Sequence, residues 1–219
     1  MRQGDRLTRP SSRKKHDAAL AAAEVQFLAT GFESVTMDSI AKESGVAKQT
    51  LYSYFGSKQE LFLALVTEKT RVTSRSVLSS VPRVTDAATA RDEVRDLLVA
   101  QLTAVMNPEV LALRRLVIGE AVRFPELARA LYENGPRVAI TSLATVIGDL
   151  VDLGLVRIAG PDADGSPDAD TAATQLNWLV MGDPVNRAML LGDDAIPTSA
   201  QLRAHVDAAL DLFFAAYGA

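Results

Sequence analysis

The chain has 219 residues, of which 48% are hydrophobic and 23% charged, as in ordinary globular proteins of one or two domains. It contains no cysteine, which excludes disulfides, thiolate metal sites and cysteine nucleophiles. The formal net charge is −4, which taken as a single number argues against a nucleic-acid partner. Aromatic residues make up only 5% and alanine is abundant, a balance that favours helices over strands.

The charge is not spread evenly. Residues 1–58 hold nine Lys and Arg against six Asp and Glu, a net charge of +3, and the other 161 residues have a net charge of −7. A basic beginning and an acidic remainder suggest two functions in one chain, although an excess of three charges is also compatible with chance. No apolar segment follows the basic N-terminus and no run approaches about 20 apolar residues, so we expect a cytoplasmic protein without membrane contact.

Residues 1–13 are polar and basic without hydrophobic periodicity, and we expect them to form a disordered arm. From residue 14 onwards, apolar residues recur every three or four positions, which predicts a helix that stops at Gly31. Thr36 is a suitable N-cap for the next helix, and Ser57 with Glu60 forms a capping box for a long fourth helix. The second and third helices are expected over residues 37–44 and 47–54.

Five further helices are predicted beyond Pro82, which gives about nine in an all-α chain. Pro136 lies inside the longest of them and is expected to kink it, because proline removes a backbone hydrogen bond. The short apolar run at residues 155–158 has no evident partner, so no strand is predicted. The five helices are expected over residues 86–106, 109–123, 125–153, 169–191 and 199–217.

Residues 36–58 meet the physical requirements of a helix-turn-helix. Gly45 supplies a turn between two short helices, and an apolar seam fixes the angle between them. The opposite face of the third helix presents side chains that can reach base edges and phosphates. The seam consists of Ile40, Ala41, Val46, Leu51 and Phe55, and the polar face of Lys48, Gln49, Thr50, Ser53 and Tyr54, with Tyr52 at its flank and Lys58 at the start of the next helix.

The ordered pattern from Thr36 through Gly45 and Tyr52 to Lys58 resembles the TetR/AcrR family of bacterial transcriptional regulators. The resemblance implies a helix-turn-helix domain over residues 14–60 and a helical ligand-binding and dimerisation domain over residues 61–219. It further implies a homodimer that binds near-palindromic double-stranded operator DNA and responds to a small-molecule effector, without a cofactor. A three-helix protein-binding bundle without DNA binding is the alternative.

The same resemblance assigns roles to single residues. It places Thr36 at the cap of the second helix and at a phosphate, and Lys58 at another phosphate. Ala47 departs from the family pattern, which often has Ser or Thr there, so readout of bases would depend more on Lys48 and Gln49. The basic arm is either a solvated tail or a further DNA contact. The DNA-binding residues expected in all are Thr36, Lys48, Gln49, Thr50, Tyr52, Ser53, Tyr54 and Lys58.

The later part of the chain resembles the C-terminal domain of AefR-like members of that family, which implies an effector pocket for a largely apolar molecule. Each candidate lining residue is otherwise a plain core or surface residue. The candidates are Met106, Leu113, Arg114, Val117, Glu120, Arg123, Phe124, Leu143, Ile147, Trp178 and Met181.

Apolar stripes on the last two helices are interpreted as a dimer interface, the other reading being that they pack within one subunit. The interface candidates are Leu176, Leu179, Val180, Leu191, Leu202, Val206, Leu210, Phe213 and Tyr217.

No metal site is predicted. The acidic run at residues 160–170 lacks the glycine and glutamate that a calcium loop requires. His16 and His205 have no carboxylates at ligand spacing and are expected on helix surfaces. Since no sequence fingerprint of a hydrolase, a metalloprotease or a nucleotide-binding enzyme is present either, we expect a ligand-responsive transcriptional regulator, most simply a repressor, and not an enzyme.

Overall fold

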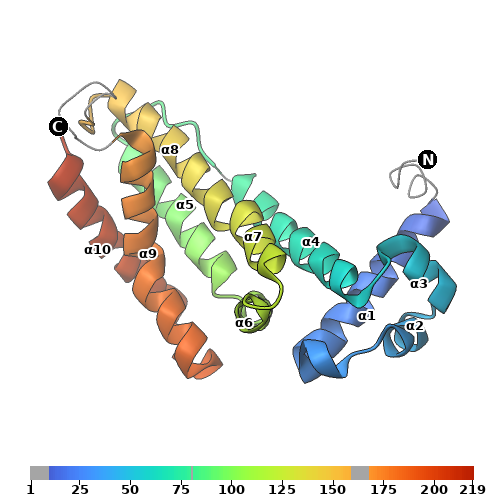
Figure 1. Ribbon diagram of the computed structural model, residues 1–219. Helices are drawn as coiled ribbons and strands as arrows, with labels where there is room; N and C mark the ends of the chain where they lie inside the picture. Colours follow the sequence, from blue (N-terminus) through green and yellow to red (C-terminus); the bar gives the residue numbers. More distant parts are fainter. Residues whose placement is uncertain (1–9, 80, 159–167) are drawn as a thin grey trace. The chain divides into compact units, whose positions relative to one another are not determined.

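A computed structural model describes residues 10–79, 81–158 and 168–219 and confirms the all-helical prediction (Figure 1). These ranges contain ten α-helices and one short 3-10 helix, η2. The helices are α1 (Pro10–Ser34), α2 (Met37–Ser44), α3 (Lys48–Phe55), α4 (Lys58–Leu78), α5 (Ala90–Val105), α6 (Pro108–Glu120), α7 (Pro125–Asn134), α8 (Pro136–Asp152), α9 (Ala169–Leu191), η2 (Asp193–Ala195) and α10 (Ser199–Tyr217).

The additional helix arises where a single kinked helix was expected over residues 125–153. Gly135 has φ −116° and ψ −96°, outside the helical region, so α7 ends before it. Pro136 then occupies the first turn of α8, where its missing N–H would have no partner within the helix. The prediction of one continuous helix was therefore wrong, although the break lies at the predicted place.

The first helix begins earlier than predicted. Residues 1–9 of the expected arm lie outside the described residues, but residues 10–13 belong to α1. Gly31 interrupts α1 with φ 79° and ψ 169°, a backbone conformation that glycine adopts without strain. The predicted stop at Gly31 is thus a real break, after which one more turn leads to Ser34.

Contacts divide the chain into two units. The first contains the described residues up to Thr70 together with Ala112–Leu131, and the second contains Arg71–Leu111 and Tyr132–Ala219. The predicted boundary at residues 60 and 61 falls inside α4, whose first half packs in the first unit. Leu113, Val117 and Leu127, from α6 and α7, are buried in the same core as Phe62 of α4.

The second unit has a core formed mainly by α5, α8, α9 and α10, which pack on one another (Figure 1). The apolar run at residues 155–158, for which no partner was expected, pairs with the end of the chain. Val156 and Gly218 form an antiparallel bridge, the N–H of Arg157 donates to the carbonyl of Tyr217 (2.8 Å) and that of Ala219 donates to Leu155 (3.2 Å). The end of α10 is thereby fixed beside the end of α8.

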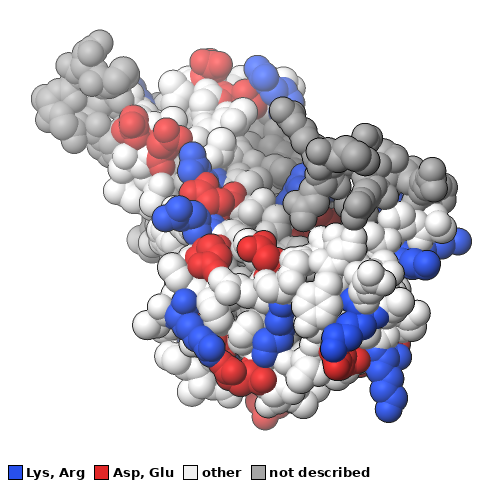
Figure 2. All heavy atoms as spheres, turned by 45° about the vertical axis from the view of Figure 1, so that its right-hand side comes forward, with Lys and Arg blue, Asp and Glu red and all other residues white. Residues whose placement is uncertain are grey.

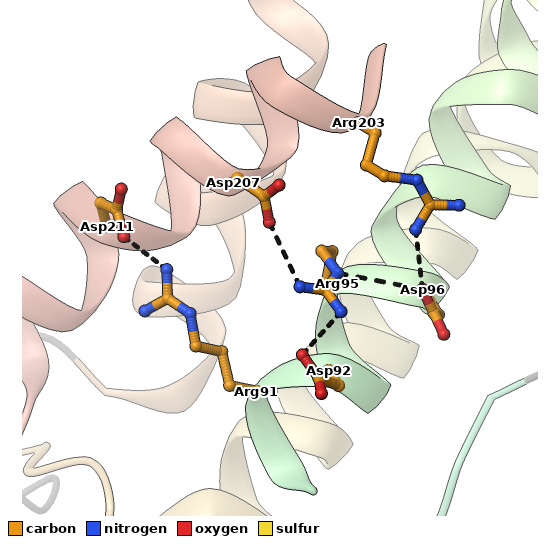
Figure 3. A network of polar contacts seen from close by, with 7 residues as sticks. All are labelled: Arg91, Asp92, Arg95, Asp96, Arg203, Asp207 and Asp211. Atoms are coloured by element: carbon orange, nitrogen blue, oxygen red, sulfur yellow. Dashed lines mark hydrogen bonds and ion pairs between the residues drawn. The ribbon is translucent and has the colours of Figure 1, made fainter. Parts of the chain in front are cut away.

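A chain of ion pairs joins α5 to α10 (Figure 3). Arg95 is at its centre, 2.6 Å from Asp92 on its own helix and 3.7 Å from Asp207 on α10. Arg203 pairs with Asp96, which also lies 4.0 Å from Arg95, and Arg91 with Asp211 forms a separate pair between the same two helices. Because the carboxylates are largely exposed, the individual pairs are weak, and the network matters as a link between two helices.

Within the described ranges, no single helix has both the length and the apolarity needed to cross a membrane. Helices α5 and α6 meet both requirements only as a pair bent by 64°. Among the same residues, no three His, Asp or Glu side chains come together in a metal-binding arrangement.

Candidate nucleic-acid interface

Helix α2 and the turn after it are fixed by local hydrogen bonds. The Thr36 hydroxyl accepts the N–H of Ser39 (3.1 Å), and the Ser39 hydroxyl accepts the N–H of Thr36 (3.2 Å). This capping box places Thr36 at the N-cap, as predicted. Gly45 ends α2 in the left-handed region with φ 66°, which makes the tight turn into α3.

One side of helix α3 is buried against its neighbours, and the opposite side is exposed to solvent. Ile40, Val46, Leu51 and Phe55 are buried, which confirms four of the five predicted seam residues, and Ala41 is half-buried. Ala47 is the N-cap and makes no side-chain hydrogen bond. The departure from the family pattern therefore does remove a hydroxyl cap from this helix.

The exposed face of α3 carries four of the predicted DNA-binding residues. Lys48, Gln49, Tyr52 and Ser53 are all exposed, and their spacing places them on one side of the helix. Thr50 is half-buried beside them. This surface offers an ammonium, an amide and two hydroxyl groups, a set that can donate to and accept from base edges and phosphates.

Tyr54, the remaining predicted residue of α3, does not lie on this exposed face. Its hydroxyl is 2.8 Å from Oγ of Ser12 and donates to the Ser12 carbonyl (3.3 Å), which ties α3 to the start of α1. The ring of His16 packs 4.9 Å from that of Phe55. His16 is therefore half-buried between helices and not a plain surface residue, and the same holds for His205, whose Nε2 is 2.9 Å from the Val180 carbonyl.

Lys58 has partners inside the protein. Its ammonium donates to the carbonyls of Phe32 (2.8 Å) and Val35 (2.9 Å) and lies 4.3 Å from the centre of the Phe32 ring. Burial lowers the pKa of Lys58, and the negative charge of Glu120 opposes that shift. The structure thus gives Lys58 the role of a cation at the end of α1, where helix carbonyls lack partners, and this differs from the predicted phosphate contact.

The net positive charge of residues 10–58 is small. Of the nine basic residues counted before residue 59, three fall in residues 1–9, outside the described part; the described six face five acidic residues. Lys48 is itself 2.7 Å from Asp38 of α2, and this hydrogen bond and charge raise its pKa. On the face in Figure 2, Lys and Arg side chains alternate with Asp and Glu.

The predicted effector residues divide between the two units. Leu113, Val117 and Phe124 pack in the first core, on the same stretch as Arg114, Glu120 and Arg123. Met106, Leu143, Ile147 and Met181 are buried in the second core. Trp178 is 50% exposed on α9 and belongs to neither. The predicted set therefore does not line one site within either unit.

Two of those polar candidates, Arg114 and Arg123, are affected by their surroundings. Burial lowers the pKa of the Arg114 guanidinium. Arg123 pairs with Glu33 and lies 4.9 Å from the Phe124 ring, which itself packs 5.1 Å from Phe32. The segment between α6 and α7 is thereby attached to the end of α1.

The predicted dimer residues are mostly internal. Six of the nine are buried in the second core and cannot form an intersubunit surface, because their helices turn this stripe toward α5 and α8. Tyr217 is half-buried against Phe213 (4.9 Å), while Leu179 and Leu191 are exposed. The six buried residues are Leu176, Val180, Leu202, Val206, Leu210 and Phe213.

Comparison with known families identifies the chain. The sequence model for the C-terminal domain of AefR-like transcriptional repressors matches residues 92–219, more than half of the chain. The model for bacterial regulatory proteins of the tetR family matches residues 19–65, which include the helix-turn-helix. The chain belongs to the TetR family. This confirms the resemblance and makes the protein a transcriptional regulator with a DNA-binding helix-turn-helix and not an enzyme.

Individual relatives of the chain are also regulators of transcription. The chain is 42% identical over 65 residues to the transcriptional activator FasR of Mycolicibacterium smegmatis, a match covering 30% of this chain but only 28% of FasR. It is 28% identical over 161 residues to the regulator BetI of Agrobacterium fabrum, covering 73% and 72% of the two chains.

Solved structures match over nearly the whole chain. A crystal structure from Mesorhizobium loti, assigned to the TetR family, superposes with a TM-score of 0.83 at 28% identity and covers 96% of this chain and all of that one. The flavonoid-responsive regulator FrrA gives a TM-score of 0.74 at 30% identity, covering 93% and 97%.

Proposed function

We propose that this TetR-family regulator is a homodimeric repressor. It binds a near-palindromic operator through α3, and a largely apolar effector releases it from the DNA. The observation that carries the DNA-binding part is the exposed face of Lys48, Gln49, Tyr52 and Ser53 on a helix whose opposite side is buried. Two such helices related by a two-fold axis would enter successive major grooves about 34–36 Å apart. A protein acting on DNA in this way works in the cytoplasm.

The dimer surface would be the outward side of α9 and α10. Leu179 and Leu190 lie eleven residues apart, three turns along the same side of α9, and both are exposed. On α10, Leu212 is 62% exposed. The exposed stripe on α10 consists of Ala204, Ala208, Leu212 and Ala215, at spacings of three and four residues. Small and apolar residues of this kind favour close packing of helices from two subunits.

Effector binding would reach the helix-turn-helix through the segment around Arg123 and Phe124. These residues belong to the same unit as α3 and contact Glu33 and Phe32 at the end of α1. A shift of α6 or α7 therefore changes the support of α1 and α4 directly. Ligand binding can favour a dimer whose recognition helices no longer fit the operator only if the two dimer states differ in affinity for the ligand.

The test is a selection of bound sequences from random duplex DNA with the full-length protein, repeated with candidate effectors. A flavonoid is a reasonable first effector, since the related FrrA is flavonoid-responsive. The Lys48→Ala/Tyr52→Ala variant should lose operator binding and remain dimeric. A matched control is Arg129→Ala/Tyr132→Ala, which removes the same charge and an exposed tyrosine from α7.

Three results would oppose the proposal or part of it. Failure to enrich any sequence would favour a protein-interaction module without DNA binding. Operator affinity that is unchanged at saturating effector would remove the release step, and operator occupancy that raises transcription would make the protein an activator.

A further inference from the structure

Gln101 is an exception among the buried polar side chains of this protein. Thr70 donates to the Val66 carbonyl (2.7 Å), and Asp149 pairs with Arg83 (3.1 Å) while accepting the N–H of Val84 (3.1 Å). Gln101 is only 2% exposed, and neither Oε1 nor Nε2 has a hydrogen-bond partner among the described residues. It therefore has one acceptor and two N–H donors facing the core without a described protein partner.

Its place on α5 explains why the amide cannot reach water. Leu97 and Leu98 lie one turn before it and Val105 one turn after, all on the side that faces the second core. Helix α5 packs against α8, α9 and α10, so Gln101 projects between helices. A second buried amide, Asn177 on α9, is 3% exposed and lies on a helix that contacts α5.

An unpaired buried amide is costly, at roughly 1–3 kcal/mol for each unsatisfied group. Leucine would fill nearly the same volume without this cost, so packing alone does not account for glutamine here. A hydrogen-bonding partner that enters the core from outside the chain does account for it. The positions one turn away from Gln101 on α5 are Leu97, Leu98 and Val105, so the body of that partner would meet apolar side chains there.

We propose that Gln101 is the hydrogen-bonding anchor of a small-molecule site in the second unit, and that its ligand carries an uncharged polar group on an apolar body. The group is one that both donates and accepts, such as a primary amide or a hydroxyl, because the glutamine side chain presents both functions. A carboxylate is disfavoured, since burying its charge beside these apolar side chains costs more than burying an uncharged polar group. The identification of this ligand with the effector rests on the proposed function.

The test uses three probes that share one benzene ring, benzamide, benzoate and toluene, on the 219-residue protein. Binding is followed by titration calorimetry and by Tm. At ten times its dissociation constant, benzamide should raise the Tm of the wild-type protein by about 3–6 °C. Benzoate should have no effect, and toluene should bind at least several-fold more weakly than benzamide.

The variant Gln101→Leu separates the site from a structural role. Its Tm without ligand should equal or exceed that of the wild type, because the unpaired amide is gone. Its affinity for benzamide should fall about tenfold, and its affinity for toluene should be unchanged or higher. Thr103→Leu, at an exposed position of the same helix, is the matched control and should leave all three affinities unchanged.

Three results would overturn the proposal. These are wild-type protein that does not bind benzamide at millimolar concentration, equal benzamide affinity in wild type and Gln101→Leu, or a Tm of Gln101→Leu several degrees below wild type. Operator binding is measured on the same samples. Loss of operator binding in every sample would contradict the proposed function and leave the result for Gln101 intact.

Discussion

The ammonium group of Lys48, the first residue of the proposed recognition helix α3, lies 2.7 Å from a carboxylate oxygen of Asp38 in α2. Both side chains are more than half exposed, so the pair is accessible to a nucleic acid. A phosphate or guanine edge that binds Lys48 must compete with Asp38 for it. We therefore expect the pair to lower the attraction of Lys48 to arbitrary phosphates and to favour DNA sites where Lys48 gains a better partner.

Removing this competitor should weaken discrimination. We expect Asp38→Asn to bind unrelated DNA several-fold more tightly than wild type, with a smaller ratio of specific to non-specific affinity. If the freed Lys48 then contacts a phosphate, the slope of log K against log salt should steepen by about 0.9 per subunit. Fluorescence anisotropy on operator and scrambled duplexes across a salt series measures both effects.

The control for this prediction is Glu43→Gln. It removes the same charge from α2, but Glu43 bonds to Gln26 and not to Lys48. Equal gains in the two variants would mean that general charge, and not the Lys48–Asp38 pair, restrains DNA binding.

One substitution distinguishes a structural role of Lys58 from a contact with a DNA phosphate. If it stabilises the end of α1, Lys58→Met should lower stability by about 1–2 kcal/mol, because charged hydrogen bonds to the Phe32 and Val35 carbonyls are lost. The salt slope of operator binding should be unchanged. A variant that keeps the wild-type Tm while the slope falls by about 0.9 per subunit would instead support the phosphate contact.

The outward side of α10 is tested by Leu212→Arg. A charge on an exposed apolar residue is tolerated in a monomer but not in the centre of a dimer interface. We expect a monomer by sedimentation equilibrium, with retained helicity and much weaker operator binding. Val72→Arg on α4, also exposed and apolar, should remain dimeric, and a dimeric Leu212→Arg would move the interface elsewhere.

The ion-pair network in Figure 3 should stabilise the fold mainly through its central residue, Arg95. Arg95 is only 27% exposed and pairs with both helices, whereas Arg91 makes one separate pair. Arg95→Met should therefore lower the free energy of unfolding by about 1 kcal/mol, and Arg91→Met by less than about 0.5 kcal/mol. Urea unfolding at low and high salt measures this, and the difference should shrink as salt rises.

The carboxylate of Asp168 should make the free energy of unfolding depend on pH. This carboxylate accepts the N–H of Thr171 (2.8 Å) at the start of α9, and this hydrogen bond lowers its pKa below the ordinary value of 3.8. The stabilisation is complete above that value and is lost as pH falls through the lower, folded-state pKa. Wild type should therefore lose more stability than Asp168→Asn between about pH 5 and pH 2. Parallel acid-unfolding curves would contradict this.

Features that depend on neighbouring residues were predictable from the sequence. The Thr36 cap and the Gly45 turn follow from local chemistry, and the alternation of buried and exposed residues on α3 follows from the helical period. The break at Gly135 was found for the same reason, although its form was not.

Features that depend on distant partners were not predictable. An apolar stripe such as that of Leu176 and Phe213 indicates burial, but the same stripe suits an internal core and a dimer interface equally well. Lys58 likewise has the chemistry of a phosphate ligand, and only the folded chain brings the carbonyls of Phe32 and Val35 to it. Gln101 was overlooked because one polar residue in an apolar stripe is easily treated as a neutral interruption of the pattern.

The inclusion of Ala112–Leu131 in the first unit has a consequence for engineering. Chimeric regulators are simplest to build by exchanging the first 60 or so residues between relatives. In this protein such an exchange would separate Phe27 from Phe62, Leu113, Val117 and Leu127, which belong to the same core. A specificity graft should therefore transplant two segments, residues 10–70 and 112–131, or else change only the exposed positions of α3 and leave the recipient core intact.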